Sequence, residues 1–177
     1  MLTGSLLDVG CGTGEHTILA AQHGARALGI DVSPRAIESA RRKAAERSTD
    51  ARFRVLDVLR LGDLGETFDT IVDSGLFHVL DDAPRSHYVT AAHAALRPGG
   101  HLHLMCFSDQ QPGDWGPRRV TQGELHATFG SGWRIVSLAP DRFNINPGLG
   151  TPTAEAWLTD VVRLAPGNGV LPTAAGT

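Results

Sequence analysis

The sequence predicts an α/β fold: a doubly wound sheet of seven strands that is mostly parallel and has an antiparallel last strand. Three observations predict it. Strand-like and helix-like segments alternate along the chain, as in parallel sheets covered by helices on both faces. A glycine-rich turn from Asp8 to Gly14 joins the first strand to the first helix. The last two predicted strands have only a loop between them, so they should pair as an antiparallel hairpin at the sheet edge.

The ends of several elements carry their own signals. Gly24 follows the first helix as a C-cap. Ser33 and Pro34 supply the N-cap and the first-turn proline of the second helix. Thr121 and Glu124 form a capping box at the start of the last helix. We therefore expect strands at about 5–9, 26–30, 52–56, 68–73, 100–107, 133–139 and 156–163, and helices at about 14–23, 34–47, 84–96 and 122–129.

Length and composition fit one domain. The 177 residues are enough for a single core, which we place in 1–165, with a frayed Pro/Gly/Ala-rich tail at 166–177. The net charge of −3 and the scattered positive residues argue against nucleic-acid binding. No segment approaches the roughly 20 apolar residues of a membrane span. From the charge and the apolar content we expect a protein that binds neither nucleic acid nor membrane. From the two cysteines and the lack of a leader sequence we expect it to be cytoplasmic.

The turn contains three glycines at alternate positions, Gly10, Gly12 and Gly14. Because glycine lacks Cβ, such a turn lets backbone N–H groups approach a ligand closely. The spacing differs from the dinucleotide fingerprint G-x-G-x-x-G, which would need glycine at Glu15. Asp31 ends the next strand, about 20 residues beyond the turn, where a carboxylate can accept both hydroxyls of a ribose. The pattern indicates a nucleotide site and speaks against a dinucleotide oxidoreductase.

Further segments follow in a fixed order, at 55–58, 68–73 and 96–100. Together with the glycine turn, they make nearly the whole chain resemble the class I S-adenosylmethionine-dependent methyltransferases, which have a Rossmann-like sheet. The resemblance implies S-adenosylmethionine as cofactor and S-adenosylhomocysteine as product. It also implies a cofactor site formed by Asp8, Gly10, Cys11, Gly12, Gly14, Asp31, Val32, Asp57, Val58 and Ser74.

Within this implied site, the glycines line the methionine portion, with Asp8 near its ammonium group. Asp31 holds the ribose, while Asp57 and Val58 frame the adenine. Each acid has a structural alternative, as a helix N-cap or a solvated loop carboxylate. The recurrence of the three acids at one sheet edge, where they would balance the charges of the cofactor, favours the binding role.

The segment from Asp73 to His78 discriminates among methyltransferase classes. It lacks the N-P-P-Y pattern of enzymes that methylate amino groups of extruded bases. In metal-dependent catechol-type enzymes an Asp-Asn pair follows the fifth strand. No such pair follows it here, so we expect no metal site. The amino-acid sequence of residues 68–78 and 116–120 is similar to that of the small-molecule branch that borders the thiopurine and thiol S-methyltransferases.

His78 is the candidate catalytic residue. It should lie near the transferred methyl group, where its ordinary pKa near 6.5 would let it take a proton from a phenol or thiol. The alternative is a histidine that only forms a hydrogen bond with the cofactor or a loop, because an ionised acceptor needs no base. His101 and His103 share a strand face, but two ligands without a third nearby do not make a metal site.

Two long loops, 108–120 and 141–152, leave strand ends and should form the walls of the acceptor site. The candidate substrate residues are Phe77, Trp115, Arg118, Arg119 and Phe143. For each of these loop residues, an ordinary solvated connection is the alternative.

The expected activity is transfer of a methyl group to sulfur or oxygen of a small soluble acceptor by direct in-line displacement. The main alternative is a catalytically silent S-adenosylmethionine-binding domain that needs a lid or a partner. Only Met1 to Gly4 precede the first strand, so we expect the N-terminal lid of related enzymes to be missing. The sequence leaves the acceptor and the oligomeric state open.

Overall fold

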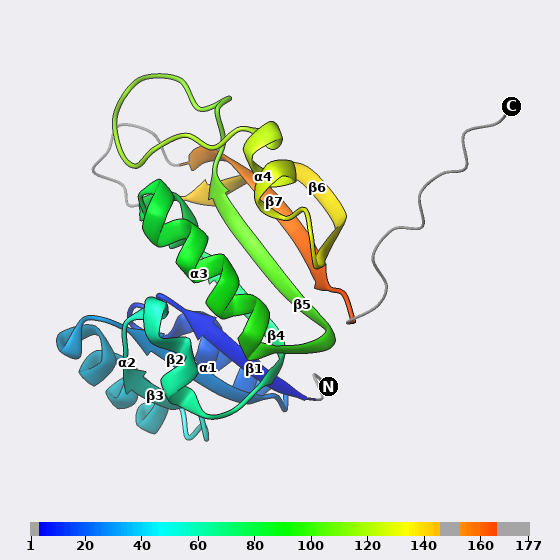
Figure 1. Cartoon of the computed structure of the whole chain (residues 1–177). Coiled ribbons are helices and arrows are strands. Elements are labelled where there is room, and N and C mark those ends of the chain that lie inside the picture. The colour runs from blue at the N-terminus through cyan, green and yellow to red at the C-terminus, as the bar shows by residue number, and fades with distance from the viewer. Residues whose placement is uncertain (1–3, 146–152, 166–177) are drawn as a thin grey trace, which may run out of the picture.

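The computed structural model describes residues 4–145 and 153–165. Its centre is a seven-stranded sheet with the strand order β3-β2-β1-β4-β5-β7-β6 (Figure 1). The strands are β1 (Ser5–Val9), β2 (Arg26–Asp31), β3 (Arg52–Val55), β4 (Phe68–Ser74), β5 (Leu96–Phe107), β6 (Trp133–Asn144) and β7 (Thr153–Arg163). The helices are α1 (Glu15–Gln22), α2 (Pro34–Glu46), α3 (Asp82–Ala95) and α4 (Gln122–Thr128), with short 3₁₀ helices η1 (Val58–Leu64) and η2 (Phe77–Val79).

Strands β1 to β5 are paired in parallel, and β7 lies antiparallel between β5 and β6. The predicted hairpin at the sheet edge is therefore confirmed. Strand β6 is longer than expected, because Asp141 to Asn144 pair with Ala156 to Thr153 instead of starting the loop. The rest of that expected loop, 146–152, lies outside the described residues, as does the expected tail at 166–177.

Two clusters of buried side chains lie on opposite faces of the sheet. On the face toward α3 and α4, the main core joins Leu102 and Leu104 of β5 to Tyr88 and Leu125 of the two helices. On the opposite face, α1 and α2 bury Ile18, Ile37, Ala40, Ala44 and Phe53 over the first three strands. Figure 1 shows α3 crossing the front of the sheet, with α1 behind it. The doubly wound arrangement is thus confirmed.

The predicted helix starts are present. The Ser33 hydroxyl accepts a hydrogen bond from the Ala36 N–H at 3.2 Å, and Pro34 opens α2. The Glu124 N–H donates to the Thr121 hydroxyl, and the Thr121 N–H donates to the Glu124 carboxylate at 2.8 Å. Both donors would otherwise be unpaired at the helix terminus, so the local sequence fixes where α4 begins.

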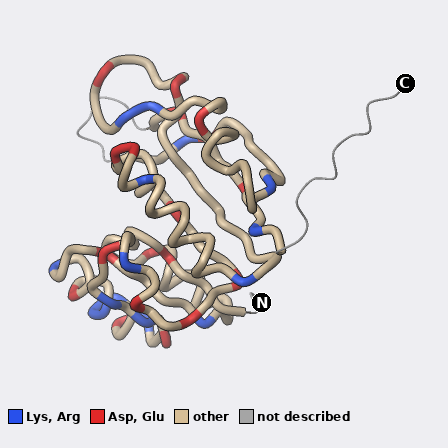
Figure 2. The backbone as a smooth tube through the Cα atoms, in the orientation of Figure 1, with Lys and Arg blue, Asp and Glu red and all other residues tan. Residues whose placement is uncertain are grey.

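Lys and Arg residues are interspersed with Asp and Glu residues along the backbone (Figure 2). Lys43 of α2 and Arg47, the residue that follows this helix, both pair with Glu15 of α1, at 2.8 and 2.7 Å. Among the helices of the described residues, none is long and apolar enough to cross a membrane.

Candidate functional site

A cavity of about 240 Å³ opens at the carboxyl ends of β1 and β2, where ligands bind in doubly wound sheets. Its lining includes five residues predicted for the cofactor site: Gly10, Asp31, Val32, Asp57 and Val58. The other lining residues are apolar and were not predicted: Ile30, Leu56, Leu76, Val79 and Leu80. A position at the end of a strand, or in the turn after β4, was the signal that could have found them.

The glycine turn presents open backbone at its centre. Gly10 and Gly12 have φ values of 65° and 53°, in the left-handed region that favours glycine. A Cβ added at Gly12 would meet no atom within 4 Å, so this backbone faces free space. Gly14 differs, because an added Cβ would lie 2.7 Å from the Phe53 ring and 2.9 Å from Ala40. Gly14 therefore serves the packing of α1 against α2 and β3.

Asp31 holds the turn in place. Its Oδ2 accepts a hydrogen bond from the Gly12 N–H at 2.9 Å, and its Oδ1 accepts one from the Ser33 N–H at 2.8 Å. Each carboxylate oxygen has a second lone pair, so these two bonds leave acceptor capacity for a ligand. Asp31 also lines the cavity, so its structural role is observed and its binding role stays a prediction.

Asp8 and Asp57 also cap helices. The Oδ2 atom of Asp8, which is buried, accepts hydrogen bonds from the N–H and hydroxyl of Thr17 at 3.1 and 2.7 Å. Burial raises the pKa of this carboxyl group. Asp57 accepts a bond from the Leu59 N–H at 2.9 Å and so caps η1. Asp57 lines the cavity, whereas Asp8 lies beneath the first turn of α1 and is not among the lining residues.

The remaining residues of the predicted cofactor site include Val32, Val58 and Cys11. Val58 is buried, whereas Val32 is 66% exposed at the rim of the cavity. Burial raises the pKa of the Cys11 thiol to about 12, with further contributions from the charges of Asp8 and Asp31. The thiol is therefore neutral at ordinary pH and does not act as a nucleophile.

Asp73 is a buried carboxyl group that was not predicted as a site residue. Its Oδ1 accepts hydrogen bonds from the N–H groups of Leu76 and Phe77, at 2.8 and 3.2 Å. Burial raises its pKa to about 6. These bonds shape the turn after Ser74, which places Leu76 against Gly10 at the cavity. An Asp at the end of a strand, followed by Ser-Gly, was the available signal for such a turn.

Next to this turn lies a group of rings that we call the aromatic cluster: His78, Phe107, Trp115 and Phe143. The centroid of the Phe107 ring lies 4.8 Å from that of His78, 5.9 Å from that of Trp115 and 5.4 Å from that of Phe143. The Arg119 guanidinium lies 5.5 Å from the Phe107 centroid. Phe107, the last residue of β5, was not predicted.

The aromatic cluster and the cavity share the loop 74–80. A Cβ added at Gly75 would lie 3.6 Å from the His78 ring and 3.9 Å from that of Phe143, while the next residue, Leu76, lines the cavity. Three of the predicted acceptor residues, Trp115, Arg119 and Phe143, thus come together next to the predicted cofactor site.

The contacts of His78 do not fit the role of a general base. The ring is 5% exposed, and its Nδ1 accepts a hydrogen bond from the Phe107 N–H at 2.9 Å. With Nδ1 as acceptor, the proton of the neutral ring is on Nε2, which leaves no free lone pair for a second proton. Burial and the charge of Arg119 lower the pKa of His78 to about 4. This geometry agrees with the alternative that His78 only forms hydrogen bonds.

Two candidate acceptor residues are placed elsewhere. Phe77 is fully buried in the core, with its ring stacked 6.0 Å from that of Phe129 and the Arg85 guanidinium 4.9 Å from its centroid. Arg118 pairs with Asp82 of α3 at 3.1 Å and with Glu124 of α4. Phe77 therefore cannot line an acceptor site, and Arg118 instead joins its loop to two helices.

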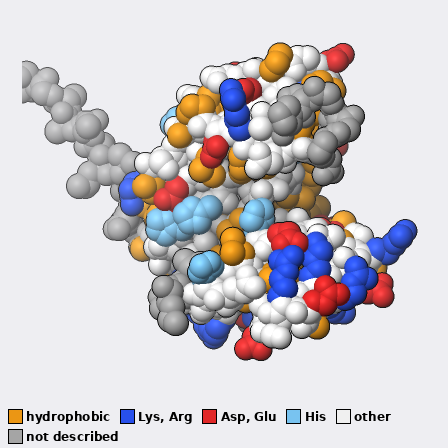
Figure 3. Space-filling view, turned by 180° about the vertical axis from the view of Figure 1, so that it is seen from behind, with side chains coloured by type: hydrophobic (Ala, Val, Ile, Leu, Met, Phe, Trp, Pro, Cys, Tyr) orange, Lys and Arg blue, Asp and Glu red, His pale blue; other side chains and the backbone are white. Residues whose placement is uncertain are grey.

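The expectation that His101 and His103 lack a third ligand nearby is wrong. Both lie on the face of β5 opposite α3, where His103 is paired in register with Asp160 of β7. Figure 3 shows histidine side chains gathered on the back of the molecule. Asp160 was not predicted, because the register between β5 and β7, which are far apart in the sequence, is not visible in the sequence.

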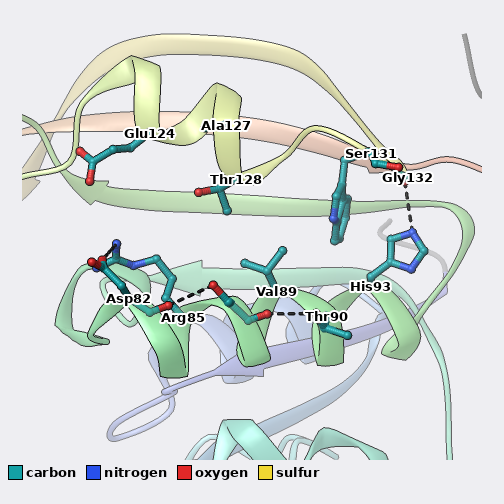
Figure 4. A pocket seen from close by; sticks show the side chains of 12 residues that line it. Asp82, Arg85, Val89, Thr90, His93, Glu124, Ala127, Thr128, Ser131 and Gly132 are labelled. Carbon is teal, nitrogen blue, oxygen red and sulfur yellow. Dashed lines mark hydrogen bonds and ion pairs between the residues drawn. The ribbon is translucent and has the colours of Figure 1, made fainter.

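A larger groove of about 690 Å³ separates α3 from α4 and the start of β6 (Figure 4). Two of its basic side chains, Arg85 and His93, are engaged within the protein. Arg85 donates to Asp82 and to the carbonyl oxygens of Phe77 and Leu80, and His93 bonds to the Gly132 carbonyl oxygen at 3.2 Å. No residue predicted for the cofactor or the acceptor lines this groove.

Comparison with known proteins agrees with the fold. Residues 6–100 match the family described as methyltransferase domain. Over 146 residues, or 81% of the chain, the sequence is 32% identical to the 2-heptyl-1-hydroxyquinolin-4(1H)-one methyltransferase of Mycobacteroides abscessus. The chain spans 64% of the length of that relative.

Two solved structures show the same architecture. One comes from work on the conversion of a disulfide bond into a thioacetal group during echinomycin biosynthesis, with a TM-score of 0.82 and 33% identity over 92% of this chain and 77% of that one. The other is the Burkholderia thailandensis 1,6-didemethyltoxoflavin-N1-methyltransferase, with a TM-score of 0.72 over 92% of this chain and 72% of that one. Its 22% identity supports the fold alone. By its family match, its relatives and its sheet, this chain belongs to the class I S-adenosylmethionine-dependent methyltransferases.

Proposed function

We propose that this chain transfers a methyl group from S-adenosylmethionine to a sulfur or oxygen atom of a small aromatic acceptor, by direct in-line displacement. The observation that carries the proposal is the position of the loop 74–80. Leu76 of this loop lines the cavity, and a Cβ added at the neighbouring Gly75 would lie within 4 Å of the His78 and Phe143 rings. A ligand in the cavity and a ring in the cluster would therefore be neighbours.

The cavity suits an adenosine group attached to a charged chain. Asp31 and Asp57 offer carboxylate oxygens for the hydroxyl and amino groups, and Leu56 and Val58 offer apolar surface for a base. The open backbone at Gly12 leaves room for the chain beyond the ribose. When bound, S-adenosylmethionine would supply a methyl group made electrophilic by the positive charge on sulfur.

The aromatic cluster favours a planar acceptor. Phe107, Trp115 and Phe143 can pack against a ring in offset or edge-to-face geometry. The Arg119 charge beside them stabilises an anion, which favours a phenol or thiol in its ionised form. The substrate named for the Mycobacteroides abscessus relative, a hydroxyquinolinone, is such a planar ring with an acidic hydroxyl group.

In a direct displacement the protein forms no covalent bond with either reactant. The acceptor atom contributes the electron pair of the new bond to carbon, and the pair of the broken bond stays on the departing sulfur. An ionised acceptor has already lost its proton to solvent, so no base is needed. Orientation of the two reactants and exclusion of water then supply most of the rate. His78, whose Nε2 lies near Gly75, would donate a hydrogen bond to the acceptor rather than take its proton.

The test is an assay of S-adenosylhomocysteine formation with matched acceptors: a phenol, an aromatic thiol and an N-hydroxy heteroaromatic compound against an aliphatic alcohol and an aliphatic thiol. We expect turnover with one or more aromatic acceptors and little with the aliphatic ones. Turnover confined to aliphatic acceptors would contradict the role of the aromatic cluster. Cofactor binding without turnover of any acceptor would instead support the silent binding domain.

A further inference from the structure

We propose that His101, His103 and Asp160 form a binding site for a zinc ion on the back of the sheet, away from the cofactor cavity. The three residues lie on two neighbouring strands, β5 and β7, where the parallel part of the sheet meets its antiparallel edge. Their ligand atoms all lie within 4.8 Å of one another.

The backbone brings the three side chains to one place. His101 and His103 occupy alternate positions of β5 and therefore project from the same face of the sheet. Asp160 is the register partner of His103 on β7, so its side chain projects from that face too. Position in two paired strands, rather than in loops, gives the ligand set a rigid base.

Both imidazole rings approach the same carboxylate oxygen. The Nδ1 atom of His101 lies 2.8 Å from Asp160 Oδ1, and that of His103 lies 3.5 Å from it. The two rings are nearly parallel, at 21°, with their centroids 5.7 Å apart. A simple histidine–carboxylate hydrogen bond would need one ring. Because both rings converge on one oxygen, all three side chains offer a ligand atom to the same small space.

The distances suit a tetrahedral ion. Bonds of about 2.0–2.1 Å to nitrogen and oxygen place tetrahedral ligands about 3.3 Å apart. The contacts of 2.8 and 3.5 Å already bracket that separation. The histidine side chains are 41% and 48% exposed, so their rings can rotate to close the remaining gap. An ion would take the Nδ1 lone pairs and leave the ring protons on Nε2.

Two imidazoles and one carboxylate favour zinc over magnesium or calcium, which prefer oxygen ligands. The fourth position of a tetrahedral zinc ion would be filled by water, which can reach it because the two histidine rings are half exposed. Bound there, the ion would link β5 to β7. It would stabilise the folded chain, because an unfolded chain does not hold the three ligands together.

The experiment is calorimetric titration of untagged, metal-free protein with zinc chloride. We expect one ion per chain. Asp160→Asn and His103→Ala should each lower the affinity by about tenfold or more, because even removal of groups that only orient a ligand costs about 10–100-fold. His126→Ala, an exposed histidine on α4, is the matched control and should leave the affinity unchanged.

A second measurement guards against misfolded variants. Zinc should raise the thermal unfolding midpoint of the wild-type chain but not that of Asp160→Asn, while both proteins keep the same affinity for S-adenosylhomocysteine. The absence of saturable binding by the wild type would overturn the site. So would variants that bind zinc as tightly as the wild type, since the ion would then lie elsewhere.

Discussion

The Asp31 carboxylate accepts a hydrogen bond from the Gly12 N–H at 2.9 Å, across the turn that separates β1 from α1. The same carboxylate lines the cavity that we propose for the cofactor. One side chain therefore shapes the glycine turn and, in the cofactor site that we propose, would present acceptors to a ribose. This double role explains why an acid is placed at the end of β2, rather than a residue that only caps α2.

Asp31→Ala should weaken the binding of S-adenosylhomocysteine by about 2–4 kcal/mol, since it removes charged hydrogen bonds worth about 1.5–3 kcal/mol each that water partly replaces. Isothermal calorimetry measures the effect. Glu38→Ala, on the exposed face of α2, is the control and should bind normally. Unchanged affinity in a stable Asp31→Ala protein would show that the carboxylate is purely structural.

The glycines of the turn should separate into binding and packing roles. Gly12→Ala places a methyl group in open space, at a strain of about 1–2 kcal/mol for its positive φ, and should mainly weaken cofactor binding. Gly14→Ala brings a methyl group within 3 Å of Phe53 and Ala40, and should lower the thermal midpoint more. Thermal unfolding and calorimetry on both variants check the distinction. Equal loss of stability in the two would contradict it.

The buried His78 should make stability depend on pH. Its pKa is about 4 in the folded chain and near 6.5 when unfolded, so the unfolded state binds the proton first as pH falls. The contribution of His78 is therefore fully present above about pH 6.5 and is lost on the way down to pH 4, by about 2 to 3 kcal/mol. Denaturant unfolding of wild type and His78→Gln across this range measures it.

Because Asp73 has its own raised pKa, near 6, the difference between the two proteins is the informative quantity. A constant difference from pH 7 to pH 4 would contradict the buried neutral ring. The same assignment predicts that methyl transfer shows no rise in rate that follows a histidine of ordinary pKa.

Trp115 and Arg118 lie in one loop but should behave differently. Trp115→Ala removes a ring of the aromatic cluster and should raise KM for an aromatic acceptor while leaving cofactor affinity unchanged. Arg118→Gln removes the ion pairs with Asp82 and Glu124 and should alter neither the KM for the acceptor nor the affinity for the cofactor. Steady-state kinetics with a varied acceptor distinguish the two. Equal effects would mean that the loop acts as a whole rather than through Trp115.

Local signals made much of the fold readable from the sequence. The capping box at Thr121, the proline at the start of α2 and the glycine turn each determine a structure within a few residues, so their outcome depends little on distant parts of the chain. The parallel order of the first strands followed from the alternation of strands and helices.

Contacts between distant strands were not readable. Phe107 and Asp160 take their positions from the pairing of β5 with β7, whose register depends on side chains far apart in sequence. Phe77 and His78 are neighbours, yet one ring enters the core and the other joins the aromatic cluster. The Phe77 N–H donates to Asp73 in the turn before them, and in the sequence this segment served only to distinguish methyltransferase classes.

Calorimetric titration of the chain with S-adenosylhomocysteine and, separately, with NAD tests the central claim most directly. The spacing of the glycines, the Asp31 carboxylate and the cavity between β1 and β2 predict saturable binding of S-adenosylhomocysteine at one site per chain and no binding of NAD. Binding of NAD without binding of S-adenosylhomocysteine would contradict the account.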